Sequence, residues 1–256
     1  MISLTHSLRQ ARRNWLWRRD IVRIHLRWKF GINWLHDVKK LSSVWRYPTH
    51  TLFDVGANVG KTALDALDRF PGILVYSFEP HPTTFEQLRR RMENQLSVNP
   101  IQLALGAEKG LAEMFEYKEH TLNSLVPDSP YITNFPQNSR QLLVERDTLD
   151  GFCAARHLNS IDVLKIDTEG YDLEVLKGAK GLLQNRAVKF IYLEFNQIVG
   201  CTEQKRGLLS PLAEMLGHFG FKFVASYNDY IWPEGGFFAV SNALFALPPE
   251  QEAKTS

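Results

Sequence analysis

Cysteine is scarce in this sequence, and several motifs that identify common protein classes are missing. Cys153 and Cys201 are the only cysteines in 256 residues, which is too few for a disulfide framework and favours a reducing, cytoplasmic setting. Neither C-x-x-C nor H-E-x-x-H spacing occurs, so we expect no metal site of the zinc type. No apolar run reaches the roughly 18 residues that a membrane span requires. The basic N-terminus also lacks the apolar core and cleavage site of a secretory signal.

Two glycine-rich phosphate-binding motifs are absent as well. The dinucleotide motif G-x-G-x-x-G does not occur. The phosphate loop G-x-x-x-x-G-K-[ST] is imitated by the stretch from Gly56 to Thr62, but Gly56 and Gly60 are one residue too close together for that loop. We therefore expect neither a conventional dinucleotide fold nor a phosphate cradle.

The composition suits one globular α/β domain with a basic appendage. Hydrophobic residues make up 44% of the chain and charged residues 23%, and the length is sufficient to bury a sizeable core. Residues 1–46 contain 11 Lys and Arg against 2 Asp, a net charge of +9, so the rest carries −7 of the total +2. We divide the chain into a basic helical extension (1–48), a main domain (49–248) and a disordered tail (249–256).

Three interpretations of the basic extension remain open. It holds five of the six Trp, and helical spacing gathers an apolar face, namely Trp17, Ile21, Ile24, Trp28 and Leu35. The extension could be helices packed on the sheet or over the substrate cleft. It could be a helix lying on an anionic membrane, since Trp and Arg suit the headgroup layer. It could also contact an anionic substrate, such as a lipid-linked saccharide or nucleic acid.

The stretch from Thr51 to Phe70 reads as a strand, a glycine turn and a helix. An apolar run ends at Asp54 and Val55, Gly56-Ala57-Asn58-Val59-Gly60 follows, and helical periodicity begins at Lys61. In an open α/β sheet, such a turn presents backbone N–H groups to a nucleotide. Gly56 would permit a sharp turn, Asn58 tolerates left-handed backbone, and Gly60 permits close helix–strand packing. We predict that the turn holds a cofactor through Asp54, Gly56, Ala57, Asn58 and Gly60.

An acidic residue closes the second predicted strand. Residues 72–78 are apolar and are followed by Glu79 and Pro80. A carboxylate about twenty residues after the glycines is placed to accept hydrogen bonds from a ribose diol. It would repel a 2′-phosphate. The cofactor would therefore be an adenosine with free ribose hydroxyls, bound by Glu79 with Pro80 beside it.

Three motifs resemble one family. Phe53-Asp54-Val55-Gly56-Ala57-Asn58-Val59-Gly60, Phe78-Glu79-Pro80, and residues 164–172 (Leu-Lys-Ile-Asp-Thr-Glu-Gly-Tyr-Asp) resemble the FkbM family of S-adenosylmethionine-dependent methyltransferases. The resemblance covers about residues 51–247. It implies an α/β, class I methyltransferase (Rossmann-like) fold, with a seven-stranded, mostly parallel sheet and helices on both faces. It also implies S-adenosyl-L-methionine as cofactor and O-methylation of a hydroxyl on a sugar, glycolipid, polysaccharide or natural product.

Further site residues follow from this resemblance. A third strand is predicted at residues 101–106, and in this fold its end meets the adenine, which makes Leu105 a candidate contact. Residues 121–140 read as a long loop over the carboxyl edge, where Asn123 and Ser124 would face the methionine end of the cofactor. An aromatic loop at residues 227–233 is suited to stacking on a sugar ring.

Carboxylates at two more strand ends are candidate catalytic groups. A fourth strand (residues 161–167) ends at Asp167, with Glu169 two residues later, and Glu194 lies near the end of a fifth strand (188–195). We predict catalytic roles for Asp167, Glu169 and Glu194, and a cofactor contact for Asp167. The alternatives are that Asp167 or Thr168 only caps the next helix and that Glu194 faces solvent. A hydroxyl is a weak acid, so either its proton leaves late or a divalent cation bridging carboxylates assists.

Smaller predictions concern single elements. Helices are expected at residues 82–96, 148–158, 173–181 and 210–219, and strands at 112–117, 221–224 and 242–247. His81 is expected to be an exposed loop residue, and the alternative is that it reaches the edge of the cofactor. Two other function classes are kept open: a nucleic-acid methyltransferase, suggested by the basic extension, and a non-catalytic nucleotide-binding module. The oligomeric state and the methyl acceptor are not indicated.

Overall fold

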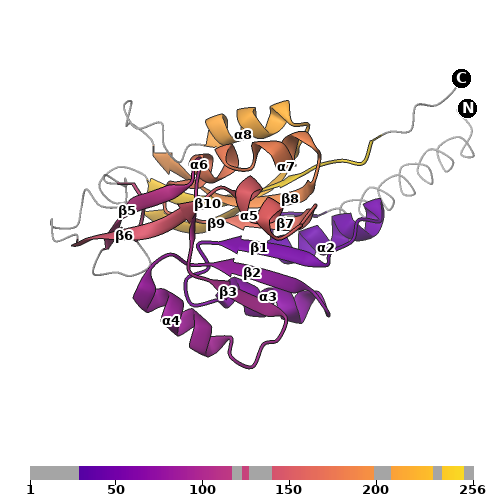
Figure 1. Ribbon diagram of the computed structural model, residues 1–256. Coiled ribbons are helices and arrows are strands. Elements are labelled where there is room, and N and C mark those ends of the chain that lie inside the picture. The colour runs from indigo at the N-terminus through magenta and orange to yellow at the C-terminus, as the bar shows by residue number, and fades with distance from the viewer. Residues whose placement is uncertain (1–28, 117–122, 127–139, 199–208, 233–237, 251–256) are drawn as a thin grey trace, which may run out of the picture.

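The computed structural model describes residues 29–116, 123–126, 140–198, 209–232 and 238–250. Its centre is a seven-stranded sheet in the order β3-β2-β1-β7-β8-β10-β9 (Figure 1). The strands are β1 (Thr51–Val55), β2 (Leu74–Phe78), β3 (Val98–Ile101), β7 (Ile161–Ile166), β8 (Val188–Ile198), β9 (Lys222–Trp232) and β10 (Phe238–Ala246). The predicted sheet of seven strands is confirmed.

Most neighbouring strands of this sheet are parallel. Strands β3, β2, β1, β7 and β8 all pair in parallel, while β10 runs antiparallel to both β8 and β9. The chain builds the sheet outward from β1, first through β2 to β3 and then through β7 to β8. The carboxyl ends of β1, β2 and β7 therefore meet where the order of strands reverses, the usual place for a ligand in an open α/β sheet.

Helices cover both faces of the sheet, as predicted. Along β1, Leu52 belongs to the core under α2, α3 and α4, whereas Phe53 belongs to the core under α5, α6, α7 and α8. This alternation is the period of two expected for a strand with both faces buried. The helices are α2 (Trp34–Trp45), α3 (Lys61–Arg69), α4 (Pro82–Arg91), α5 (Leu149–Ala155), α6 (Asp172–Lys177), α7 (Lys180–Gln184) and α8 (Leu209–His218).

The described part of the basic extension packs against the sheet. Asn33 caps α2, because its side chain accepts a hydrogen bond from the His36 amide. Trp34 stacks on Tyr192 of β8 with ring centroids 4.3 Å apart. The predicted apolar face from Trp17 to Trp28 lies outside the described residues. Within the described ranges, no helix combines the length and hydropathy that crossing a bilayer requires.

A second, three-stranded sheet has the order β4-β6-β5. Strand β4 (Ala104–Leu105) pairs in parallel with β6 (Arg140–Asp147), and β5 (Gly110–Glu116) pairs antiparallel with β6. The prediction of one strand over residues 101–106 was wrong, because the chain leaves the main sheet after β3 and enters the small one at β4. Pro100 is accommodated because β3 is an edge strand.

The aromatic loop predicted at residues 227–233 was also wrong. Residues up to Trp232 belong to β9, and the pairing with β10 continues to Trp232 opposite Phe238. Tyr227 is buried and donates a hydrogen bond to Asp37 of α2 over 2.7 Å. The pairing of β9 with β10 determines the structure of this segment. The side chain of Tyr227 packs in the core rather than in a sugar site.

Two helix predictions were also too long. Helix α4 ends at Arg91, so Leu96 lies beyond it and is 96% exposed. The helix predicted at residues 173–181 is split into α6 and α7 at Gly178, where an added Cβ would clash with the backbone oxygen of Gly106. The close approach of the two backbones explains why a glycine is required at the break.

Candidate active site

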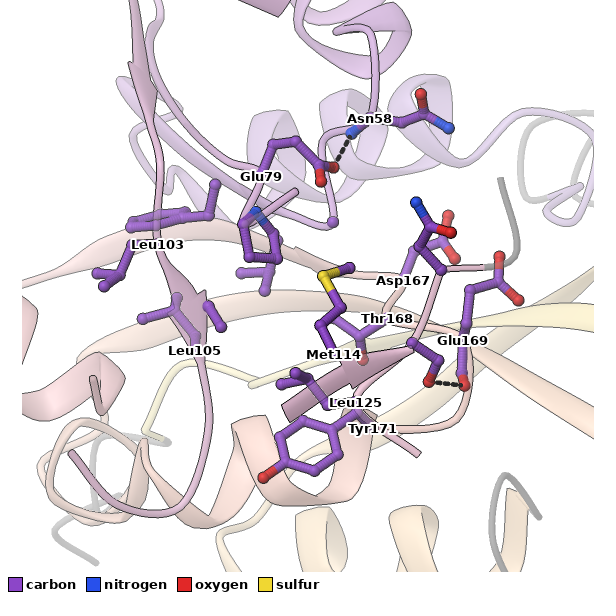
Figure 2. A pocket seen from close by; sticks show the side chains of 17 residues that line it. Asn58, Glu79, Leu103, Leu105, Met114, Leu125, Asp167, Thr168, Glu169 and Tyr171 are labelled. Atoms are coloured by element: carbon purple, nitrogen blue, oxygen red, sulfur yellow. Dashed lines mark hydrogen bonds between the residues drawn. The ribbon is translucent and has the colours of Figure 1, made fainter. Parts of the chain in front are cut away.

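A cavity opens at the carboxyl ends of β1, β2 and β7, where the small sheet meets the main sheet (Figure 2). The space between its lining residues is about 670 Å³ when the open mouth is included. In Figure 2, apolar side chains line one part of it and the carboxylates of Asp167 and Glu169 lie in another. The lining residues predicted from the sequence are Gly56, Asn58, Glu79, Pro80, Leu105, Asn123, Ser124, Asp167 and Glu169.

Three predicted cofactor residues do not line the cavity. They are Asp54, Ala57 and Gly60. Gly60 has a φ of 81°, and an added Cβ would press on Met92 and Leu88, both at or next to α4. Gly60 thus permits close approach of α4 rather than of a strand.

The glycine turn has the backbone conformation that its sequence indicates. Gly56 has a φ of 76° and Asn58 a φ of 48°, so both are left-handed. An added Cβ at Gly56 would clash with the backbone oxygen of Asp167. The glycine is therefore required where the end of β7 crosses close to the end of β1.

The amides of the turn are already hydrogen-bonded within the protein, contrary to expectation. The amides of Gly56 and Ala57 both donate to the Phe78 carbonyl, and the amide of Gly60 donates to the Ala57 carbonyl. The Asn58 amide donates to Glu79 Oε2 over 2.9 Å (Figure 2). The turn is thus fastened to the end of β2, and these amides are not open donors for a nucleotide.

Glu79 is held in place by two backbone amides. Its Oε2 accepts from Asn58 and its Oε1 accepts from His81, each over 2.9 Å. Burial raises the pKa of Glu79 to about 7, although both amide hydrogen bonds oppose that rise. Each carboxylate oxygen keeps a second lone pair, so Glu79 can still accept hydrogen bonds from a diol in the cavity.

His81 is buried, so the expectation of an exposed loop histidine was wrong. It is the N-cap of α4 and is only 3% exposed. Its Nε2 lies 3.3 Å from Glu116 Oε1, at the end of β5. His81 therefore connects the end of β2 to the small sheet.

Behind the cavity, a buried lysine joins the ends of β1 and β7. Lys165 Nζ lies 3.0 Å from Asp54 Oδ1 and 3.3 Å from Asp167 Oδ2. It also donates to the Gly56 carbonyl over 2.9 Å. Burial lowers the pKa of Lys165, but Asp54 and Asp167 outweigh burial and raise it. For Asp54, burial raises the pKa of the carboxyl group, and the charge of Lys165 opposes that rise.

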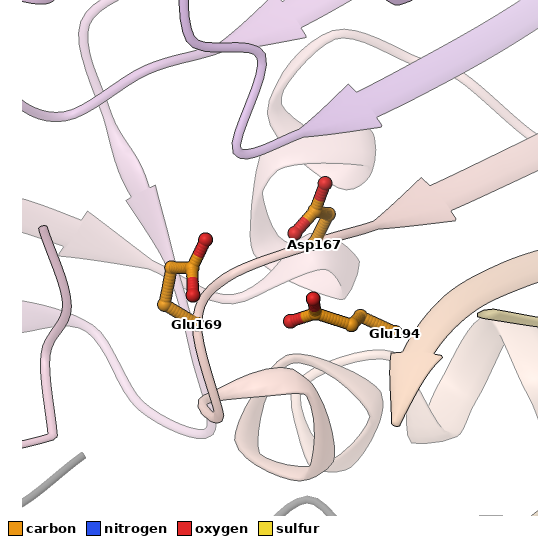
Figure 3. A group of neighbouring side chains, drawn as sticks. All are labelled: Asp167, Glu169 and Glu194. Atoms are coloured by element: carbon orange, nitrogen blue, oxygen red, sulfur yellow. The ribbon is translucent and has the colours of Figure 1, made fainter. Parts of the chain in front are cut away.

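Three carboxylates converge beside the cavity (Figure 3). Asp167, Glu169 and Glu194 each place one carboxylate oxygen within 4.8 Å of the others. Oxygen ligands of this kind suit a hard divalent cation, although acidic side chains also gather without one. Burial, followed by the charges of Asp167 and Asp172, raises the pKa of Glu169 well above its usual value.

The turn that carries Glu169 is held in an unusual conformation. Glu169 has a φ of 54°, in the left-handed region that disfavours a residue with a side chain. Ser124 Oγ donates to the Glu169 carbonyl over 2.8 Å (Figure 2). Ser124 is itself paired through its backbone with Phe115 of β5. A single buried serine thus ties the acidic turn to the small sheet.

Sequence reasoning missed several residues of the site. Met114, Leu125 and Tyr171 line the cavity. No local pattern marks Met114 and Leu125, because packing of the small sheet brings them there, whereas Tyr171 belongs to the motif at residues 164–172 but was not singled out. Lys165 did carry a signal. A lysine in the middle of an apolar strand needs a buried partner, and Asp54 and Asp167 provide it.

Comparison with known proteins identifies the kind of domain. The family model described as the methyltransferase FkbM domain matches residues 54–223. A 31-O-demethyl-FK506 methyltransferase FkbM of Streptomyces tacrolimicus is 27% identical over 205 residues, 71% of this chain and 76% of the relative. The 2-O-methyltransferase NoeI of Sinorhizobium fredii is 24% identical, over 62% of this chain and 68% of the relative.

A third relative and one solved structure complete the comparison. A hexuronic acid methyltransferase AglP of Haloferax volcanii is 27% identical, over 57% of this chain and 55% of the relative. Among solved structures, a putative sarcosine dimethylglycine methyltransferase of Galdieria sulphuraria covers 84% of both chains with a TM-score of 0.49 and 10% identity.

Proposed function

This chain belongs to the FkbM methyltransferase family, and on that premise we propose that it transfers a methyl group from S-adenosylmethionine to a hydroxyl oxygen of a sugar, glycolipid, polysaccharide or natural product. The observation that carries the proposal is the cavity itself. It places a buried carboxylate, Glu79, and a convergent acidic group around Asp167 within one space at the end of β1. Neither a nucleic-acid methyltransferase nor a non-catalytic module is favoured by the relatives.

The donor side of the cavity suits an adenosine. Glu79 accepts the ribose hydroxyls with the lone pairs that Asn58 and His81 leave free. Apolar side chains from both sheets provide a surface for the base, among them Leu103, Leu105 and Met114. When bound, the donor supplies a methyl group activated by the positive charge of its sulfonium. The protein need not generate that electrophile and has only to align it.

The acceptor side is assigned to the acidic group. Asp167 and Glu169 line the cavity, and Glu194 approaches both. Their carboxylates would orient the acceptor hydroxyl and receive its proton as the new C–O bond forms. The same three oxygens could bind a divalent cation, which would increase the acidity of the hydroxyl.

Titration calorimetry with S-adenosylhomocysteine tests the donor site. We expect the wild-type chain to bind the ligand and Glu79→Ala to bind it at least about tenfold more weakly, because a charge-assisted hydrogen bond is lost. Asp162→Asn is the matched control. It alters another buried carboxylate, which accepts hydrogen bonds from His50 and Thr51 at the far end of β7. Equal affinities of wild type and Glu79→Ala would remove the ribose assignment.

Identification of the acceptor requires comparison of cells. Mass spectrometry of glycans, lipids and metabolites from cells with and without the gene should show a species that differs by one methyl group. Asp167→Asn should retain affinity for S-adenosylhomocysteine but lose most of this product. Full product formation by that variant would refute a catalytic role for Asp167.

The basic extension supports a separate proposal about location. We propose that the part of the extension that precedes α2 holds the enzyme at an anionic surface such as a membrane face. The support is compositional, namely the net +9 over residues 1–46 together with five Trp. The described portion, α2, packs on the sheet instead. Surface contact would bring the cavity near lipid-linked acceptors.

A further inference from the structure

Lys165 contacts groups at the ends of β1 and β7, two neighbouring strands that meet at the cavity. Its ammonium contacts Asp54 at 3.0 Å, Asp167 at 3.3 Å and the Gly56 carbonyl at 2.9 Å. Lys165 as a whole residue is 5% exposed. Gly56 and Asp167 line the cavity, whereas Asp54 and Lys165 do not. Lys165 is therefore one layer behind the surface that a ligand would meet.

A lysine that only balanced the charge of one buried carboxylate would need fewer contacts than Lys165 makes. The charge of a buried lysine can be balanced by one carboxylate, and Asp54 already provides it. The additional bonds to Gly56 and Asp167 fix one group on each of two adjoining strand ends. Among the described residues, Lys165 is the single buried lysine or arginine, so no second buried cation duplicates its contacts.

The contact with Lys165 is one of several attachments of the glycine turn. The amides of Gly56 and Ala57 fasten the turn to β2 through the Phe78 carbonyl. The carbonyl of Gly56 points the other way and is held by Lys165. Loss of Lys165 would leave that carbonyl free to rotate and would leave Asp167 without its 3.3 Å partner.

We propose that Lys165 is a positioning residue: it holds the Gly56 turn in the geometry that binds the nucleoside donor, and it fixes the Asp167 carboxylate on the acceptor side. This inference rests on the proposed function, because it assumes that the cavity binds an S-adenosyl ligand. Because Lys165 does not line the cavity, it would touch neither the ligand nor the reacting atoms.

The test must separate folding from positioning, because Lys165→Met leaves Asp54 buried without a counter-charge and lowers stability. The double variant Asp54→Asn/Lys165→Met removes both charges and should recover most of the melting temperature. Asp54→Asn alone keeps the contacts of Lys165 with Gly56 and Asp167. Asp162→Asn is the matched structural control, since it perturbs the same β1–β7 pair at its other end, about 10 Å from Lys165 along the strand.

The measurements are thermal unfolding and calorimetric titration with S-adenosylhomocysteine. We expect Lys165→Met and the double variant to bind about tenfold more weakly than wild type, as for a lost hydrogen bond to a charged group. Asp54→Asn should lose less affinity than the double variant. Asp162→Asn should lower the melting temperature and keep the wild-type affinity.

Two outcomes would overturn the inference, and they are distinguishable. If the double variant regains both stability and wild-type affinity, Lys165 only balances the charge of Asp54, and the proposed function stands. If the wild-type chain itself binds no S-adenosylhomocysteine, the proposed function fails and this inference fails with it.

Discussion

At the scale of single residues, the site is shaped by carboxylates that are harder to ionise than usual. Burial raises the pKa of Glu79 to about 7 and that of Asp172 to about 6, and it raises the pKa of Glu169 well above 4.5. Lys165 is the buried cation nearest to them, and its contacts go to Asp54 and Asp167. The cavity therefore holds an excess of acidic groups, which a cationic donor would relieve.

The raised pKa of Glu79 predicts pH-dependent ligand binding. A carboxylate that accepts from two hydroxyls must be ionised, so below pH 7 binding requires loss of a proton. The affinity for S-adenosylhomocysteine should therefore fall as the pH is lowered from 8 to 6, by up to about tenfold per unit below the pKa. Calorimetry across this range measures the effect. Glu79→Gln has no such proton to lose, and a slope equal to that of the wild type in this variant would contradict the assignment.

The strained position of Glu169 predicts that its replacement stabilises the fold. Glu169→Gly removes a side chain from left-handed backbone and a carboxylate from beside Asp167 and Glu194. We expect a gain of about 1 kcal/mol in the free energy of unfolding together with loss of methyl transfer. Urea unfolding at pH 7 measures the first and product formation the second.

The pH dependence of this gain has a definite sign. Because the folded-state pKa of Glu169 is raised, the wild type loses stability as the pH rises above about 4.5. The gain from Glu169→Gly should therefore grow between pH 5 and pH 8. His157→Gly is the control. His157 has a similar φ of 55°, but it is exposed and does not belong to the acidic group of the site. A loss of stability in Glu169→Gly would show that this residue supports the fold instead.

At the scale of elements, the sequence predicts what local pattern determines. Strand β1, the glycine turn and α3 lie within a residue of their predicted bounds, because apolar periodicity and glycine placement are local signals. The wrong predictions concern segments whose structure depends on pairing with a strand far away in the sequence. Strand β9 continues to Trp232 because β10 pairs with it, and the chain divides into β3 and β4 because β6 takes Ala104 and Leu105 into another sheet.

The same distinction applies to the candidate site. Motif residues at the ends of β1, β2 and β7 were predictable, since parallel strands bring their carboxyl ends to one edge. The opposite wall of the cavity was not predictable, because packing of the small sheet is what brings Met114 and Leu125 to the cavity. The internal pairing of the turn amides was equally hidden, since it depends on the carbonyl of Phe78 in the neighbouring strand.

The contact between α2 and β9 gives a prediction at this scale. Tyr227 donates to Asp37, which is 1% exposed and otherwise accepts from the Gly31 amide. Tyr227→Phe should cost about 1–3 kcal/mol of unfolding free energy and speed amide exchange in residues 34–45. Tyr47→Phe is the comparison, because it removes a hydrogen bond to a neutral carbonyl, that of Leu247. Equal losses in the two variants would mean that the buried charge of Asp37 carries no special weight.

At the scale of the whole molecule, charge is separated between the extension and the body. The body carries −7 and the extension +9, so a nearly neutral chain has two oppositely charged parts. An anionic surface would attract the extension and repel the body. Such a distribution would orient the enzyme on a membrane as well as hold it there.

Attachment of the extension to an anionic surface can be tested with the full chain and a charge-matched control. Replacement of Arg18, Arg19 and Arg23 by Gln should weaken cosedimentation with phosphatidylserine-containing vesicles by about a hundredfold, at about 1 kcal/mol for each charge near the surface. Replacement of Arg89, Arg90 and Arg91 by Gln removes the same charge from the exposed side of α4, where Glu86 pairs with two of them. The control should bind vesicles as the wild type does, because those arginines belong to the acidic body. Equal weakening in both triple variants would mean that net charge alone governs binding, and the extension would then have no anchoring role of its own.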